Sequence, residues 1–174
     1  MAVLGGAKVS DKIQVVERFV ELADTILIGG AMANTFLNYK GVHVGASKVE
    51  SDQKDTLDSI YRAAEKKVGD KVDEFIVLPT DLAVATKIDD SAKRHNQQLD
   101  RIKVDEMGLD IGDESIERFT EIISGAKSVV WNGPMGVNEL REFAHGSARV
   151  ALALATHPGI DSIVGGGDTA DFVL

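Results

Sequence analysis

The chain has 174 residues, and 44% of them are hydrophobic, so length and composition predict one domain with a continuous core. Acidic residues outnumber basic ones by 28 to 19, giving a formal net charge of −9. The acidic residues are scattered, and the clustered positive charge that a nucleic-acid-binding face needs is absent. No apolar run approaches the roughly 18 residues of a membrane span, and no signal-peptide pattern is found. We therefore expect a soluble, cytoplasmic protein with neither nucleic-acid nor membrane partners.

Cysteine is absent, which excludes disulfides and thiolate metal sites. The four histidines lack the short paired spacings that are typical of zinc sites. We interpret them as surface residues.

Short apolar runs rich in β-branched residues alternate along the chain with longer segments of helical periodicity. The runs that we expect to form strands are Val3–Leu4, Thr25–Ile28, Phe75–Leu78, Ser128–Trp131 and Ser162–Val164. Helices are expected between them, over Ile13–Ala23, Leu57–Val68, Ile116–Ile123 and Val150–Ala155. The strands are mostly apolar, as strands covered on both faces tend to be. The alternation predicts an α/β fold with a mostly parallel sheet.

The stretch from Leu82 to Met107 breaks this rhythm. Two strand-like runs, Ala83–Thr86 and Arg101–Val104, are separated by the polar run Ser91–Gln98. We predict a small antiparallel excursion from the main sheet here.

Four of the five expected strands run directly into glycine. The loops are Gly5-Gly6, Gly29-Gly30, Asn132-Gly133-Pro134 and Gly165-Gly166-Gly167. Ligands of open α/β sheets bind beyond the carboxyl ends of strands, where the strand order reverses, and in the common order 3-2-1-4-5 the first and fourth loops flank that point. One glycine pair is most simply a turn with positive φ, but four at one edge predict an anion site. None matches a Walker A or G-x-G-x-x-G pattern.

Charged residues stand beside the first and last of these loops. Lys8 and Lys12 would share a helix face if the helix has begun, and although two solvated lysines are the simpler account, their position beside Gly5-Gly6 favours a phosphate ligand. Asp168 follows the last glycines, where it would cap a helix or hold Mg²⁺ together with substrate phosphates.

Five segments, in order, resemble the signature segments of the nucleotide-binding C-terminal domain of phosphoglycerate kinase, in its bacterial style. They are Gly5–Ile13, Gly29–Phe36, Gly108–Gly112, Trp131–Val137 and Gly165–Thr169. The resemblance extends over essentially the whole chain and implies that residues 1–174 form that domain. It implies a three-layer, Rossmann-like sandwich with strand order 3-2-1-4-5, the family's final strand missing, and the antiparallel excursion around residues 82–107.

The resemblance also implies reversible phosphoryl transfer between 1,3-bisphosphoglycerate and MgADP, giving 3-phosphoglycerate and MgATP in glycolysis. It assigns Lys12 as the catalytic residue, Lys8 as a second phosphate ligand, and Asp168 as the Mg²⁺ ligand. The other residues that it assigns to the nucleotide are Gly6, Ala7, Gly30, Ala31, Gly108, Leu109, Asn132, Gly133, Pro134, Val137, Glu139, Gly165, Gly166, Gly167 and Thr169. Such transfer depends on positioning and charge neutralisation, so no covalent nucleophile is needed.

The chain departs from the family pattern at three positions. Asn138 stands where an aromatic residue is usual, Ala31 where glycine is frequent, and Lys48 where an aliphatic residue often lies against the adenine. We expect these departures to weaken nucleotide binding.

Relative to the family, the N-terminal domain that binds 3-phosphoglycerate and the segment after Leu174 are missing. We therefore expect no activity without the other domain, through which alone 3-phosphoglycerate would be engaged. The family is usually monomeric, but the missing strand would leave the fifth strand as a sheet edge, so we expect marginal stability or self-association. The alternative function is a stand-alone nucleotide-binding or regulatory module without kinase activity.

Overall fold

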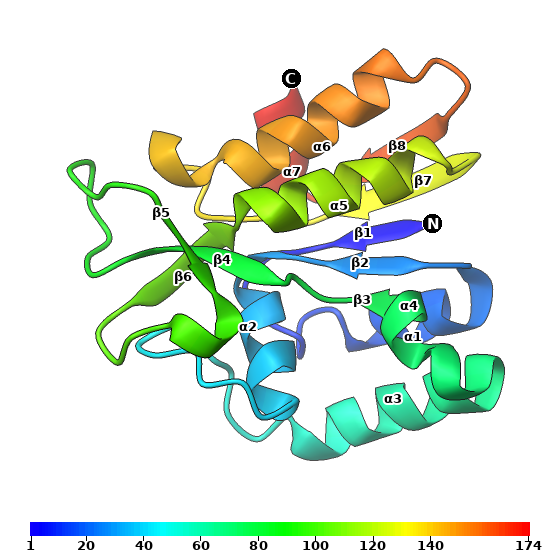
Figure 1. The fold of residues 1–174 in the computed structure, drawn as a ribbon. Coiled ribbons are helices and arrows are strands. Elements are labelled where there is room, and N and C mark those ends of the chain that lie inside the picture. Colours follow the sequence, from blue (N-terminus) through cyan, green and yellow to red (C-terminus); the bar gives the residue numbers. More distant parts are fainter.

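The computed structural model describes residues 1–174 and is built around a parallel sheet of five strands (Figure 1). The strands are β1 (Ala2–Leu4), β2 (Ile26–Ile28), β3 (Ile76–Val77), β7 (Ser128–Asn132) and β8 (Asp161–Gly165). Their order across the sheet is β3-β2-β1-β7-β8, which confirms the predicted order 3-2-1-4-5. The strand order therefore reverses between β1 and β7, the point at which α/β sheets bind their ligands.

Helices cover both faces of the sheet, as the three-layer prediction requires (Figure 1). One layer contains α1 (Ile13–Leu22), α2 (Gly30–Tyr39), α3 (Lys54–Val68) and α4 (Val72–Phe75), and the other contains α5 (Asp113–Ser124), α6 (His145–Thr156) and α7 (Gly167–Val173). Single 3₁₀ turns are η1 (Gly69–Lys71), η2 (Leu99–Arg101) and η3 (Arg141–Phe143).

Alternation along the strands divides the core into two apolar clusters. On β1, Leu4 joins the cluster beneath α1, α2 and α3, whereas Val3 joins the cluster beneath α5 and α6. Trp131 is completely buried in the second cluster. Because neighbouring side chains point to opposite faces of a strand, a run that is apolar at every position must be covered on both sides.

The helices follow their apolar spacing. In α3 the buried residues are Leu57, Ile60, Tyr61 and Ala64, which recur at the three- and four-residue intervals of one helix face. The amino end of α5 is satisfied by a residue from outside the helix, because the Asp81 carboxylate accepts hydrogen bonds from the backbone N–H groups of Glu114 and Ser115.

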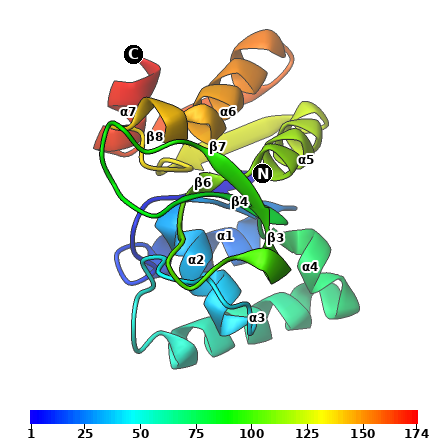
Figure 2. The same cartoon turned by 60° about the vertical axis from the view of Figure 1, so that its left-hand side comes forward.

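A second, antiparallel sheet of three strands interrupts the alternation, as predicted. Its order is β5 (His95–Gln98), β4 (Asp81–Ala85), β6 (Met107–Ile111), and Figure 2 brings it to the front of the molecule. Strand β6 packs against α2 and α6, so this sheet bridges the two helical layers.

One strand of that excursion was predicted wrongly. Residues 101–104 form the end of η2 and a loop, and Val104 is 89% exposed. The polar segment His95–Gln98 forms the strand instead. As an outer strand with mostly exposed side chains, β5 takes its backbone hydrogen bonds from β4 and does not need apolar residues.

Strand β8 forms one edge of the five-stranded sheet and pairs only with β7. Its Ile163 side chain is 67% exposed. The antiparallel excursion does not cover this edge, because it forms a separate sheet.

Candidate functional site

A cavity of about 420 Å³ opens beyond the carboxyl ends of β1 and β2, beside the point at which the strand order reverses. Its lining comes from segments that are far apart in the sequence. The lining residues are Gly6, Ala7, Gly30, Ala31, Ala46, Lys48, Ile88, Met107, Gly108, Leu109, Pro134, Gly136, Val137, Glu139 and Asp168.

One side of the cavity, which we call the glycine rim, consists of Gly5-Gly6, Gly29-Gly30 and Gly133-Pro134. These loops pack backbone against backbone: the N–H of Gly6 donates to the Pro134 carbonyl at 2.9 Å. Gly30 has φ +66°, and a Cβ there would lie 2.6 Å from the Gly6 nitrogen. Only glycine allows this conformation and approach without strain, so the sequence requires glycine here for the loops to meet.

The opposite side, which we call the sheet wall, consists of Met107–Leu109 and Gly136–Glu139. The N–H of Val137 donates to the Leu109 carbonyl at 2.8 Å and holds the two segments together. Helix α2 supports the wall, because the Asn34 amide donates to the Gly108 carbonyl at 3.2 Å. The wall is mostly apolar, with Glu139 exposed at its end.

Lys12 lies beneath the rim and does not line the cavity. Its ammonium donates to the Gly5 carbonyl at 2.7 Å and to the Asn132 carbonyl at 3.1 Å, at the ends of the adjacent strands β1 and β7. Burial lowers the pKa of Lys12 from its ordinary value, while Asp11 and Asp168 oppose the shift. The half-buried ammonium thus lies at the reversal of strand order, between the ends of β1 and β7.

Lys8 lies elsewhere. It is exposed in the turn before α1, which begins only at Ile13, so Lys8 and Lys12 do not share a helix face. The condition for a shared face, a helix that has begun before Lys12, is not met, because Lys12 is the N-cap residue and has no helical conformation.

The last glycine loop joins the site through α7. Asp168 lies in the first turn of this helix and lines the cavity, whereas Gly166 occupies the N-cap position. Asp168 is therefore not the helix cap, and its exposed carboxylate is free to face a ligand. The buried hydroxyl of Thr169 accepts a hydrogen bond of 2.8 Å from the Gly133 N–H, which fixes α7 against the rim.

The structure brings most of the predicted nucleotide residues to one cavity. Those that do not line it are Lys8, Lys12, Asn132, Gly133, Gly165, Gly166, Gly167 and Thr169. Some of these residues lie close to one another: a Cβ on Gly166 would lie 3.3 Å from the Asn132 side-chain oxygen, and the Gly133 N–H bonds the Thr169 hydroxyl.

Four lining residues were not predicted: Ala46, Ile88, Met107 and Gly136. Ala46 and Ile88 come from loops whose sequences carry no local signal. Met107 adjoins the identified segment Gly108–Gly112, and Gly136 lies within the identified segment Trp131–Val137 without having been assigned to the nucleotide.

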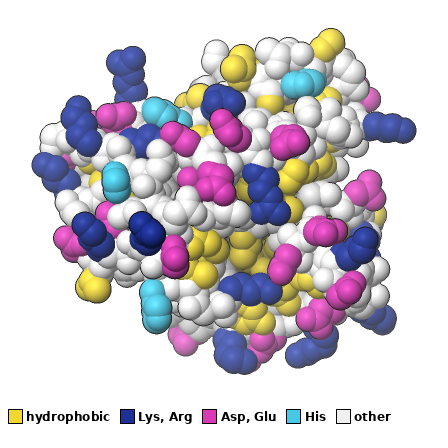
Figure 3. All heavy atoms as spheres, in the orientation of Figure 1, with side chains coloured by type: hydrophobic (Ala, Val, Ile, Leu, Met, Phe, Trp, Pro, Cys, Tyr) yellow, Lys and Arg dark blue, Asp and Glu magenta, His cyan; other side chains and the backbone are white.

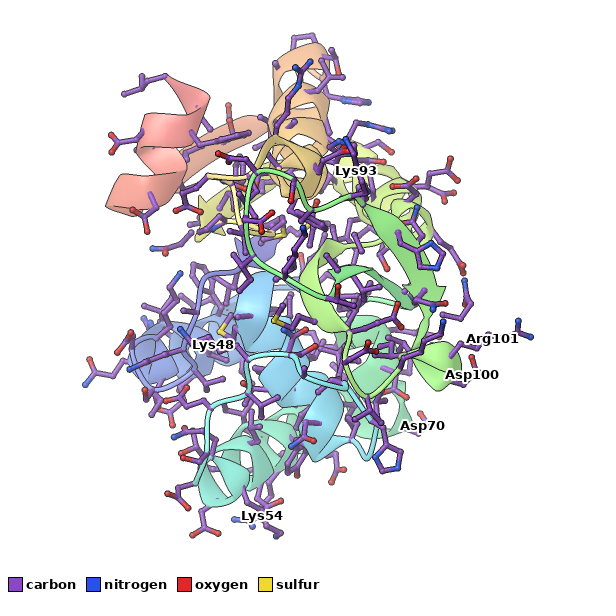
Figure 4. The ribbon with its side chains drawn as sticks, turned by 90° about the vertical axis from the view of Figure 1, so that its left-hand side faces the viewer. Lys48, Lys54, Asp70, Lys93, Asp100 and Arg101 are labelled. Atoms are coloured by element: carbon purple, nitrogen blue, oxygen red, sulfur yellow. The ribbon has the colours of Figure 1, made fainter.

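The three positions that depart from the family pattern, Lys48, Asn138 and Ala31, lie in or near the cavity. Lys48 lines the mouth of the cavity beside α2, as Figure 4 shows. The side-chain oxygen Oδ1 of Asn138 accepts a hydrogen bond of 2.9 Å from the Ser147 hydroxyl, which in turn accepts one from the Met135 N–H. The Asn138 amide nitrogen is buried without a partner. Ala31 lines the cavity next to Gly30.

No group of three histidine, aspartate or glutamate side chains could hold a metal ion by itself. Acidic and basic side chains intermingle on the face shown in Figure 3, without a continuous basic patch. No helix combines the length and the apolar character that crossing a membrane requires.

Comparison with known proteins gives a consistent result. The family model for phosphoglycerate kinase matches residues 1–174. The phosphoglycerate kinase of Akkermansia muciniphila is 50% identical over 173 residues, and that of Enterococcus faecalis is 47% identical over 170 residues. These matches cover 97% and 98% of this chain but only 41% of each relative. The chain thus spans about two fifths of the length of the curated relatives it matches.

Solved structures agree with the sequence matches. The phosphoglycerate kinase of Coxiella burnetii superposes with a TM-score of 0.90 at 34% identity, covering 98% of this chain and 43% of that one. The kinase of Pyrococcus horikoshii gives a TM-score of 0.72 at 36% identity, covering 97% and 42%. With its sheet order, its glycine-lined cavity and a family match along its whole length, the chain belongs to the phosphoglycerate kinase family.

Proposed function

We propose that this chain is the nucleotide-binding part of a phosphoglycerate kinase and binds MgADP and MgATP in the cavity between the glycine rim and the sheet wall. The complete enzyme would transfer a phosphoryl group reversibly between 1,3-bisphosphoglycerate and ADP in glycolysis. The observation that carries the proposal is the meeting of three glycine loops and an apolar wall beside the reversal of strand order. Sites of this kind bind nucleotides by apolar contact with the base and by backbone groups and cations near the phosphates.

Each end of the cavity suits one part of a nucleotide. The apolar surface of Met107, Leu109 and Val137 suits a base, and exposed Glu139 suits ribose hydroxyls. Asp168 and the ammonium of Lys12 lie toward the rim, where phosphates would lie. Phosphoryl transfer needs neutralisation of charge on the phosphoryl oxygens and a fixed geometry. Lys12 supplies the charge, and the rim supplies the rigidity.

The donor set also suits Mg²⁺ that arrives with its nucleotide. Mg²⁺ is commonly held by one or two carboxylates together with substrate phosphates, and Asp168 offers one exposed carboxylate at the cavity. Bound there, the ion would neutralise phosphate charge. The absence of any three-ligand cluster is consistent with this mode of binding.

Calorimetric titration of the chain with MgADP tests the nucleotide site. We expect a dissociation constant between micromolar and low millimolar, equivalent to about 4 to 8 kcal/mol. No heat of binding and no competition by MgATP would refute the proposed site.

Reconstitution tests the kinase assignment. The chain would be mixed with the remainder of the Enterococcus faecalis kinase, made separately, and ATP formation from 1,3-bisphosphoglycerate and MgADP followed. We expect activity only in the mixture. Tight MgADP binding without activity in any mixture would favour a stand-alone nucleotide-binding module.

A further inference from the structure

Arg94 is a buried cation that the proposed function does not use. It lies at the end of the loop between β4 and β5, and its side chain is only 7% exposed. Its partner Asp110, on β6, has a side chain with no exposure at all. Every other ion pair in the chain has at least one exposed partner. A buried charge is costly unless its hydrogen bonds are satisfied, so the surroundings of this pair are informative.

The Arg94 guanidinium donates to three separate segments. On β6 it bonds the Asp110 carboxylate at 2.7 Å and the Ile111 carbonyl at 2.8 Å. It also bonds the Asp113 carboxylate in the first turn of α5 at 3.0 Å and the Glu142 carbonyl in η3 at 3.2 Å. A planar guanidinium with several fixed donors can join segments in this way, whereas an ammonium cannot reproduce the geometry.

Asp110 joins a fourth segment. Its carboxylate accepts hydrogen bonds from the N–H of Ile111 at 2.8 Å and from the N–H of Gly146, in the first turn of α6, at 3.0 Å. Burial raises the pKa of Asp110 to about 7, while Arg94 and these N–H donors oppose the rise. A Cβ on Gly136 would lie 2.6 Å from an Asp110 oxygen, so the carboxylate packs directly behind a residue of the cavity lining.

Two of the segments that meet at this ion pair carry the sheet wall, and a third, the β4–β5 loop, carries Ile88 of the cavity lining. Strand β6 carries Met107–Leu109. The segment that ends in η3 carries Gly136–Glu139. The glycine rim is held differently, by backbone bonds between the ends of β1, β2 and β7, such as the 2.8 Å bond from the Gly29 N–H to the Leu4 carbonyl. The rim makes no hydrogen bond with Arg94 or Asp110.

We propose that Arg94 and Asp110 are positioning residues that hold the sheet wall in register, and so set affinity for the base and ribose of the nucleotide but not for its phosphates. The inference rests on the proposed function, because it assigns the wall to the nucleoside. It makes the Arg94–Asp110 pair a determinant of ligand affinity although neither residue lines the cavity.

The test compares two ligands on three variants of the chain. R94M removes the charge, R94K keeps the charge but lacks the planar guanidinium with its fixed donors, and K67M is the control. Lys67 also bonds backbone carbonyls, those of Val20, Glu21 and Ala23 near the end of α1, and it does not line the cavity. Calorimetry measures the affinity for MgADP and for magnesium tripolyphosphate.

We expect R94M to weaken MgADP binding by about tenfold or more, with R94K intermediate and tripolyphosphate binding unchanged. K67M should leave both ligands unaffected. If R94M proves unfolded by circular dichroism, the comparison is read from R94K. Unchanged MgADP affinity in the folded Arg94 variants, or an equal loss for both ligands, would overturn the inference alone. Absence of MgADP binding to the unaltered chain would remove the proposed function and the inference with it.

Hydrogen exchange gives a second measurement that needs no ligand. Loss of Arg94 should speed exchange of the Val137 amide, which bonds Leu109 in the wall, and leave the Gly29 amide in the rim unchanged. Equal acceleration at both amides would indicate general destabilisation and contradict a role confined to the wall.

Discussion

The glycine rim and the sheet wall form two sides of one cavity but are built by different means. The rim is backbone packed on backbone, with hydrogen bonds between loops and no side chain between them at Gly6 and Gly30. The wall is formed by side chains and by a loop that an internal ion pair holds in place. A rim of this kind has one geometry and tolerates no added atoms, whereas a wall of side chains can change its shape by substitution. We infer that the rim suits the part of a ligand that is invariant, and the wall suits the part that varies.

The largest expected effect is at Lys12, the cation beneath the rim. K12M should lower the rate of phosphoryl transfer in the reconstituted enzyme by about 10³-fold, because charge on the transferred group loses its neighbour. K8M is the matched control, since Lys8 is exposed four residues earlier. Its effect should be far smaller. Equal losses in the two variants would contradict the special role of the buried ammonium.

Alanine substitutions compare the rim and the wall directly. In G30A the new Cβ would lie 2.6 Å from the backbone nitrogen of Gly6, so we expect destabilisation of more than about 3 kcal/mol. In G108A it would lie 2.8 Å from the movable end of Leu82, and we expect about 1 to 2 kcal/mol. Urea denaturation measures both.

The control for these two substitutions is G69A. Gly69 has the same φ as Gly30, +66°, but open space around its Cβ position. It measures the cost of a Cβ at positive φ without a steric contact, expected to be about 1 to 3 kcal/mol. A rim variant no less stable than G69A would show that the backbone contacts of the rim are unimportant.

A smaller effect should be visible in proton uptake. Burial lowers the pKa of Lys12, and a bound phosphate would raise it again. Between the lowered pKa and the ordinary value, the free chain carries less than one proton on Lys12 and the complex carries more. MgADP binding at alkaline pH should therefore take up a fraction of a proton, measured by calorimetry in buffers of different ionisation enthalpy. K12R, which stays charged, should abolish the uptake; persistence of the uptake in K12R would assign it to another group.

The smallest effect concerns the edge strand β8, which lies away from both sides of the cavity. We expect weak self-association of the chain through this edge, because exposed strand edges pair with other chains. I163K should reduce it by placing a charge on β8, whereas L152K, at an exposed position on α6, should not. Sedimentation velocity over a range of concentrations measures this. A monodisperse monomer at every concentration would contradict the prediction.

Much of the fold could be predicted because covered parallel strands must be continuously apolar. The run Ile26–Ile28 is apolar and buried at every position, as a strand covered on both faces must be. The strand prediction failed where a segment is not covered on both faces and does not need to be apolar. Strand β5 is polar because its side chains are mostly exposed, and Ile102 contributes to a small apolar cluster from a loop. Periodicity carries no information about such segments.

The candidate site divides in the same way. Rim residues were predictable because a turn with positive φ and a close approach of two backbone segments require glycine. Gly6 and Gly30 can therefore be recognised in the sequence. The start of α1 at Ile13 also agrees with the helix expected over Ile13–Ala23. The hydrogen bonds of Lys12 to the ends of β1 and β7 were not predictable. Nor was the Arg94–Asp110 pair, since two residues 16 positions apart become partners only through the antiparallel sheet. When tertiary structure brings two distant side chains together, the sequence around each residue does not indicate the partner.

Trp131 gives this site an optical property. Its indole N–H donates to the Gly133 carbonyl at 2.8 Å, inside the rim. It is the only tryptophan in the chain. A displacement of the Gly133 peptide would change the electric field at the indole ring, so the emission spectrum of the unlabelled protein would report the conformation of this one loop.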